Sequence, residues 1–156
     1  MRPPLTPARP LGLAIDASAG SGWVAVLADD QVIARRDWTT LRDATARLPL
    51  LTADVLAEAR LAAGTLALVA VVAGPGSYTG LRASLAFAHG LALASGTSLI
   101  AVTVEEACAG GGAATPESVA RAAARRQAGL LPRLAPVPVY AGPAQARVAP
   151  MRPAPA

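Results

Sequence analysis

The sequence contains no lysine, and it has only one cysteine and one histidine among its 156 residues. A single cysteine, Cys108, excludes a disulfide within the chain, and we expect it to be a small buried apolar side chain. A single histidine, His89, excludes a metal site built from several histidines. It also argues against a Ser-His-Asp triad, because His89 lies in the middle of a predicted helix. No metal site and no catalytic residue are predicted.

Aromatic residues make up only 3% of the chain although 53% of it is apolar, so the core must be built mainly from alanine and aliphatic side chains. Such cores bury little area per residue, which favours support from a partner. No run of about 18 apolar residues occurs, and the N-terminus lacks the apolar stretch of a secretory signal. We therefore expect a cytoplasmic protein without a membrane span.

All basic residues are arginines, and the net charge is +4. They are scattered along the chain until the segment RAAARR near the C-terminus. This pattern favours a solvated basic helix over a nucleic-acid site.

Hydrophobic patterning predicts five strands and two long helices. Two short turns join the first three strands, which indicates an antiparallel meander. The fourth strand is apolar throughout, as expected of a parallel strand buried on both faces. Pro49 is expected to start or to break the first helix. The strands are predicted at 11–18, 23–29, 31–38, 65–74 and 98–104, and the helices at 41–63 and 79–95.

The resulting order, β-β-β-α-β-α-β, predicts an α/β fold with a five-stranded mixed sheet and helices packed on it. This is the layout of one lobe of the actin-like ATPase, ribonuclease-H-like superfamily. Residues 1–10 are rich in proline and are expected to form a flexible leader, followed by the lobe at 11–109. Residues 110–156 hold a short helical segment and a Pro- and Ala-rich tail, too little for a second domain.

The stretch VVAGPGSYTGLR, from Val71 to Arg82, joins the fourth strand to the second helix. A Walker P-loop needs a lysine here, and the glycines are spaced one residue too widely for a dinucleotide fingerprint. Two interpretations stay open: a structural turn capped by Ser77 or Thr79, or an anion site at the N–H groups of the helix start. The residues of such an anion or nucleotide site would be Asp16, Ser18, Gly74, Gly76, Ser77, Thr79, Gly80 and Arg82.

Acidic residues also stand at the ends of two predicted strands. Asp16 ends the first strand, and we favour an Asx turn over a carboxylate that meets Mg-phosphate. Glu105 and Glu106 follow the fifth strand and are expected to be charges at a helix N-terminus rather than a catalytic pair.

The helix at 79–95 has two apolar faces, one more than a surface helix needs. The second is either buried within the lobe or packs on a partner. The first face holds Leu81, Leu85, Ala88 and Ala92, and the second holds Ala83, Phe87, Leu91 and Ala94.

Two segments, LAIDAS and GPGSYTGLRASLAFAHGLALASGTSLIAVTVEEA, closely resemble the TsaB family, also called YeaZ. The resemblance covers residues 11–109, and the step from the glycine loop into the helix is its most specific part. The tail segment PVPVYAGPAQARVAP is also similar to the end of that family's sequences.

The resemblance implies an actin-like fold and a non-catalytic partner of TsaD in making N6-threonylcarbamoyladenosine at position 37 of tRNA. The ATPase TsaE joins these two proteins, and tRNA is an indirect partner. ATP and magnesium would then belong to the complex, with no cofactor in this chain. Family members pair through two helices, with TsaD or as homodimers. Carried over, that interface comprises Leu48, Leu51, Val55, Ala83, Phe87, Gly90, Leu91 and Ala94.

The chain is shorter than is usual for the family, and the resemblance places the missing part between about Ala109 and Ser118, where the strands of the second lobe would lie. Three hypotheses follow: a TsaB-like accessory subunit, which we favour; a nucleotide-binding enzyme of the actin-like kinase class that uses Asp16 and the glycine loop; and a truncated, inactive paralogue.

Overall fold

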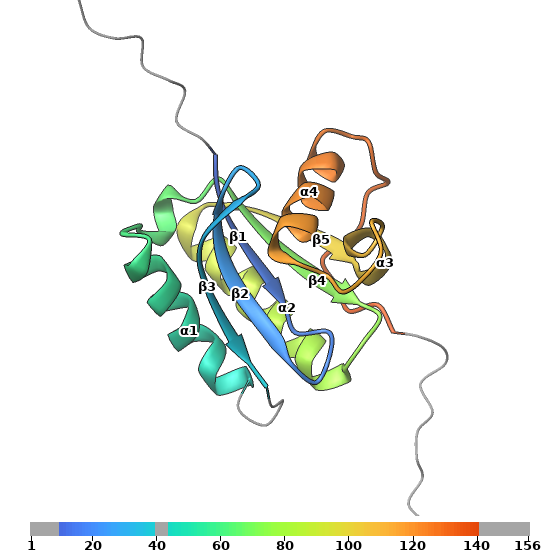
Figure 1. The fold of residues 1–156 in the computed structure, drawn as a ribbon, viewed down its shortest axis with the longest axis horizontal. Helices are drawn as coiled ribbons and strands as arrows, with labels where there is room; N and C mark the ends of the chain where they lie inside the picture. Colours follow the sequence, from blue (N-terminus) through green and yellow to red (C-terminus); the bar gives the residue numbers. More distant parts are fainter. Residues whose placement is uncertain (1–9, 40–43, 141–156) are drawn as a thin grey trace, which may run out of the picture.

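The computed structural model describes residues 10–39 and 44–140, so most of the predicted leader and the tail beyond Tyr140 lie outside the described residues. Figure 1 shows one sheet with helices on both faces. In chain order the elements are β1 (Leu11–Asp16), β2 (Gly22–Ala28), β3 (Gln31–Trp38), α1 (Ala44–Glu58), a 3-10 turn η2 (Ala63–Thr65), β4 (Leu68–Gly74), α2 (Tyr78–Ser95), β5 (Ser98–Thr103), α3 (Val104–Ala107) and α4 (Pro116–Gln127).

The sheet has the strand order β3-β2-β1-β4-β5. β1 pairs antiparallel with β2 and parallel with β4, and β5 extends the parallel half. The apolar run of β4 is buried along Val69–Gly74, as predicted for a central parallel strand. The predicted α/β fold with a five-stranded mixed sheet and an actin-like, ribonuclease-H-like order is confirmed.

Side chains that alternate along each strand build two separate cores. On one face, large aliphatic side chains such as Leu13 and Ile15 pack against α1 and α2. On the other face the strands present small side chains such as Ala14 and Ala70 to α4. Small residues on both sides let α4 lie close to the sheet, and Val119, Ala122 and Ala123 are buried there.

The segment after residue 109 is part of this second core. Thr103 and Thr115 each cap a helix with a reciprocal side-chain pair, which begins α3 and α4. Arg126 reaches from α4 to Glu106 of α3 and donates to the Ala101 carbonyl of β5 at 2.6 Å. The boundary at residue 109 stays a prediction, but α4 covers the face of the sheet opposite α1 and α2 (Figure 1).

Several predicted limits were wrong by a few residues. α1 ends at Glu58 rather than at residue 63, because the chain turns at Arg60, which has a φ of +55°. The fourth strand begins at Leu68, since Ala63–Thr65 form a 3-10 turn. Pro49 neither starts nor breaks α1; the helix continues through it without the hydrogen bond that a proline cannot donate.

Candidate functional site

The glycine loop begins α2 as a capped turn. The Ser77 hydroxyl accepts a hydrogen bond from the Gly80 N–H at 3.2 Å, so Ser77, and not Thr79, is the cap. Gly80 is buried, whereas Thr79 is exposed. At the other end, Gly96 closes the helix in the left-handed conformation that glycine favours, with a φ of +69°.

The loop packs directly on the turn after β1. The Asp16 carboxylate accepts a hydrogen bond from the Ser18 N–H at 2.8 Å, which is the predicted Asx turn. The Ser77 N–H donates to the Ser18 carbonyl at 2.7 Å. A Cβ on Gly76 would lie 2.1 Å from that carbonyl oxygen, so this position requires glycine. The predicted site residues of the two loops are therefore brought together, but they contact one another.

The last described residues cross the same loop. We call Leu134–Tyr140 the strap. The Val139 N–H donates to the Ala73 carbonyl at 2.8 Å, and a Cβ on Gly74 would lie 2.3 Å from the Val139 carbonyl oxygen. Gly74 has a φ of +118°, so both its conformation and its contact with the strap favour glycine.

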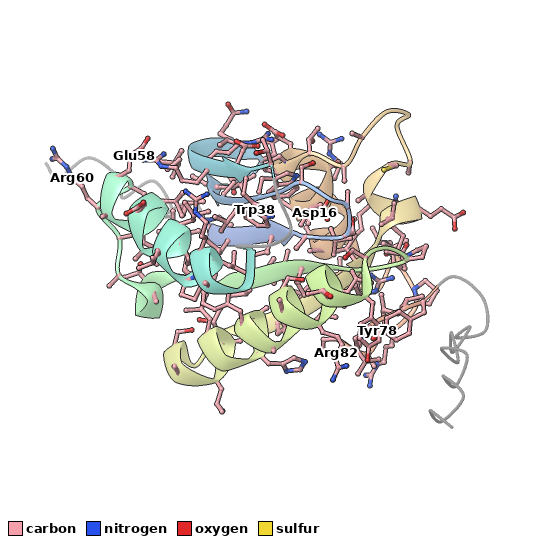
Figure 2. All side chains as sticks on the ribbon, turned by 90° about the horizontal axis from the view of Figure 1, so that it is seen from below. Asp16, Trp38, Glu58, Arg60, Tyr78 and Arg82 are labelled. Carbon is pink, nitrogen blue, oxygen red and sulfur yellow. The ribbon has the colours of Figure 1, made fainter. Side chains whose placement is uncertain are left out.

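The strap continues along one side of α2. The rings of Tyr78 and Tyr140 stack with centroids 5.4 Å apart, and the guanidinium of Arg82 lies 4.9 Å from the Tyr78 ring centroid. Figure 2 shows Tyr78 and Arg82 side by side, at the end of α2 that lies farther from Arg60. About two turns further along α2 from Arg82, His89 Nε2 lies 2.7 Å from the Pro136 carbonyl oxygen. The strap was not predicted, because its contacts join segments far apart in the sequence.

These contacts support the structural-turn interpretation of the glycine loop. Gly74 is covered by the strap, Gly76 by the turn after β1, and the Gly80 N–H by Ser77. Arg82, the cation expected to help an anion site, lies over Tyr78 instead.

The predicted interface residues divide by depth. Leu48 and Val55 are buried in the core under α1. They therefore cannot contact a partner directly and only support the exposed residues of α1. Leu51, Ala83, Phe87 and Leu91 are half-buried, while Gly90 and Ala94 are exposed. The sequence interpretation missed two side chains: Leu50, which is 68% exposed, and Leu93, which is 87% exposed. Their positions opposite the buried stripe of each helix were the available signal.

We call the exposed apolar strip of α1 and α2 the two-helix surface; it comprises Leu50, Ala53, Ala57, Ala86, Gly90, Leu93 and Ala94. The two helices are neighbours in the layer on one face of the sheet (Figure 2). A Cβ on Gly90 would meet no atom within 4 Å, so the strip is open at its middle. Such a surface can receive a helix at close range.

The ionisable groups of α3, outside this surface, cap the helix and form an ion pair. Glu106 accepts from the Thr103 N–H at 2.9 Å and pairs with Arg126. Burial raises the pKa of Glu106, but hydrogen bonds from Arg126 and Thr103 outweigh it, so its pKa lies below the usual range. The predicted role of Glu105 and Glu106 as N-terminal helix charges matches α3. Cys108 is half-buried rather than buried, because it follows the end of α3.

Within residues 10–39 and 44–140, no group of three His, Cys, Asp or Glu side chains could hold a metal ion. None of the helices in those ranges is long and apolar enough to cross a membrane.

The family model "TsaD: tRNA N6-adenosine threonylcarbamoyltransferase" matches residues 39–131, more than half of the chain. The chain belongs to this family. Within the TsaD family it is YeaZ-like: it aligns with YeaZ from Pseudomonas aeruginosa at 29% identity and a TM-score of 0.59. That alignment covers 64% of this chain and 46% of YeaZ, so the chain spans less than half the length of this relative.

A second solved structure, described as an uncharacterized protein with similarity to peptidase YeaZ from Pseudomonas aeruginosa, aligns with the same identity, coverage and TM-score. RuvC of T. thermophilus, solved in complex with a Holliday junction substrate, aligns at 15% identity and a TM-score of 0.53. It covers 77% of this chain and 96% of RuvC, and at that identity the likeness shows the fold alone. No curated protein matches the sequence.

Proposed function

We propose that this TsaD-family chain is a non-catalytic accessory subunit that docks on a TsaD-type enzyme and supports N6-threonylcarbamoyladenosine modification of tRNA. The observation that carries the proposal is the two-helix surface, together with membership of the family. The likeness to YeaZ supports an accessory role for a chain of this kind.

The surface has the properties of a helix-packing interface. Leu50 and Leu93 are large apolar side chains exposed in the isolated chain, and the residues between them are small. Small residues allow backbones to approach, and each leucine that becomes buried stabilises a complex by about 2 kcal/mol. A TsaD-type partner of related fold would offer matching helices, and a second copy of this chain would offer the same strip in a homodimer.

The proposal gives the chain no chemistry of its own. The glycine loop is filled by the strap and by the turn after β1, so it serves to position α2. ATP, magnesium and the TsaE-type ATPase then act elsewhere in a cytoplasmic complex, and tRNA is its substrate. Titration calorimetry of the chain alone with Mg-ATP is expected to show no binding; tight, magnesium-dependent binding would contradict this assignment.

Co-purification with the TsaD-type enzyme of the same source tests the docking surface. Leu93→Glu and Leu50→Glu place a carboxylate in the two-helix surface, and each is expected to weaken binding more than tenfold because a buried charge would lose its water. Leu130→Glu is the matched control, since Leu130 is also 68% exposed but follows α4. Calorimetry then measures each dissociation constant.

The variants separate the outcomes. Loss of binding with both surface variants and retention with Leu130→Glu supports the proposal. Equal binding by all four proteins, or no binding by the wild type, rejects it. Light scattering of the wild type and of Leu93→Glu without partner shows in parallel whether the same strip forms a homodimer.

A further inference from the structure

The outer face of α4 carries two exposed arginines. Arg121 and Arg125 are exposed and lie one turn apart, about 6 Å along the helix axis. Among the described residues, neither makes an ion pair or a side-chain hydrogen bond. Ala124 between them is too short to cover either guanidinium. These two side chains therefore point a pair of cations at solvent from one rigid element.

Arg133 is a third exposed cation, in the segment that follows α4. The Pro132 carbonyl accepts from Arg126 Nε at 2.7 Å, which fixes the chain just before Arg133. Arg133 is exposed and makes no ion pair or side-chain hydrogen bond among residues 10–39 and 44–140. We call Arg121 and Arg125 the arginine face.

Acidic groups also lie near these arginines, but none in the described residues forms an ion pair with them. Asp29 and Asp30 line a second hollow together with Arg121. Glu106 is engaged by Arg126. Glu117 lies one turn before Arg121 but makes no ion pair there, and Arg35 of β3 is close enough to feel its charge. Glu105 is the one unpaired carboxylate of the described residues around the adjoining hollow, which has a volume of about 420 Å³ and is also lined by Arg121 and Arg125.

We infer that the arginine face binds the phosphate backbone of RNA, so that this chain contacts RNA directly. Guanidinium groups match phosphate oxygens with two parallel hydrogen bonds, and unpaired arginines on an exposed helix form an electrostatic footprint for a polyanion. The chain's net charge of +4 also favours binding of a polyanion. The inference deepens the proposed function and rests on it for the choice of RNA over other polyanions.

The contrast with the opposite layer supports the assignment. The two-helix surface is apolar and offers no phosphate partner, while α4 exposes no large apolar side chain for protein docking. A chain that joined an enzyme by one face would then leave the arginine face free to meet the RNA of that assembly (Figure 1).

The test measures RNA binding by the full chain, with and without the TsaD-type enzyme. The test variant is Arg121→Gln/Arg125→Gln, which removes both charges while keeping good helix formers. The matched control is Arg47→Gln/Arg60→Gln, because Arg47 and Arg60 are also exposed and make no ion pair within the described part of the chain, but lie on or after α1. Circular dichroism and thermal melting confirm that both variants fold.

Fluorescence anisotropy with a labelled tRNA transcript gives dissociation constants over a range of salt concentrations. The test variant is expected to bind about tenfold more weakly, and its plot of log K against log salt should be less steep by about 1.5, because two phosphate contacts are lost. The control should keep the wild-type slope. A binding measurement with inorganic phosphate alone distinguishes a site for free anions from a site for the phosphate backbone of RNA.

Three outcomes overturn the inference. They are equal RNA binding by the wild type and the test variant, an equal loss in the control, and binding of inorganic phosphate without RNA. Co-purification distinguishes the two proposals. If the wild-type chain does not bind the enzyme but the test variant binds RNA more weakly than the wild type, only the proposed function is rejected. If the wild-type chain binds the enzyme but the test variant binds RNA as tightly as the wild type, only the inference about the arginine face is rejected.

Discussion

The two helical layers of this protein differ both inside and outside. The layer of α1 and α2 is held to the sheet by large aliphatic side chains, and its outer strip is apolar, with Leu50 and Leu93 among small residues. The layer of α4 is held by alanines, Val119 and the Arg126–Glu106 pair, and its outer face carries arginines. One layer thus depends on apolar burial and the other on a charged anchor, and each outer face suits a different kind of partner.

The largest effect is expected from removing the charged anchor. Arg126→Ala leaves Glu106 without its partner and also removes hydrogen bonds to the Ala101 and Pro132 carbonyls. The side chain of Arg126 is only 8% exposed, so the free energy of unfolding should fall by about 3 kcal/mol. Urea unfolding measures this, with Arg125→Ala as a control that should change it by less than about 0.5 kcal/mol.

The effect should also depend on pH. The pKa of Glu106 is depressed in the folded state, so its pairing stabilises the fold at pH values above about 4.5, its ordinary pKa. As the pH falls through the lower folded value, Glu106 is protonated and this stabilisation is lost. The difference between wild type and Arg126→Ala should be constant near neutral pH and shrink below it; a constant difference down to pH 2 would contradict the role of the pair.

The second effect concerns the strap that crosses the other layer. Gly74→Ala combines an unfavourable backbone conformation with a clash against the Val139 carbonyl, so we expect a loss of about 3 kcal/mol. Gly112→Ala is the control, because Gly112 also has a positive φ, +85°, but has open space around its Cβ position. It should cost about 1 kcal/mol in the same urea experiment. Equal losses would mean that the strap does not lie against Gly74.

The smallest effect is expected at the aromatic end of the strap. Tyr140→Ala removes the ring stacked on Tyr78 and should lower the free energy of unfolding by about 1 kcal/mol. Tyr140→Phe keeps the ring and should leave stability nearly unchanged. Thermal unfolding compares the two, and hydrogen exchange at Val139 shows whether the strap has loosened. An equal loss in both variants would point to the hydroxyl rather than to stacking.

Most of the fold follows from local patterns. The apolar run of β4, the meander of β1 to β3 and the glycine turn before α2 determine the strand order and the first helical layer. The second layer was recognised only as a short helix, because the pattern of α4 does not show which strands it covers. Its place on the sheet depends on buried residues such as Val119 and Ala123 and on the pair between Arg126 and Glu106. These contacts join segments far apart in the sequence and have no local signal.

The candidate site was predicted in part. Ser77 as helix cap and Asp16 as the residue of an Asx turn follow from local turn chemistry. The exposure of Leu50 and Leu93 follows from their positions away from the buried stripes, yet the apolar content of both helices obscured it. The covering of Gly74 by Val139 required tertiary structure, since no local rule connects those segments.

The position of the strap in the sequence has a consequence for synthesis on the ribosome. The sheet and both helices of the first layer are complete once Thr103 has been made, but α4 and the strap emerge later. Because chains fold as they are made, the nascent lobe exposes an uncovered sheet face and an open β4 carboxyl end during that interval. Translation that stops between α3 and the strap would therefore release a lobe with both surfaces bare, which is the form that chaperones and proteases recognise.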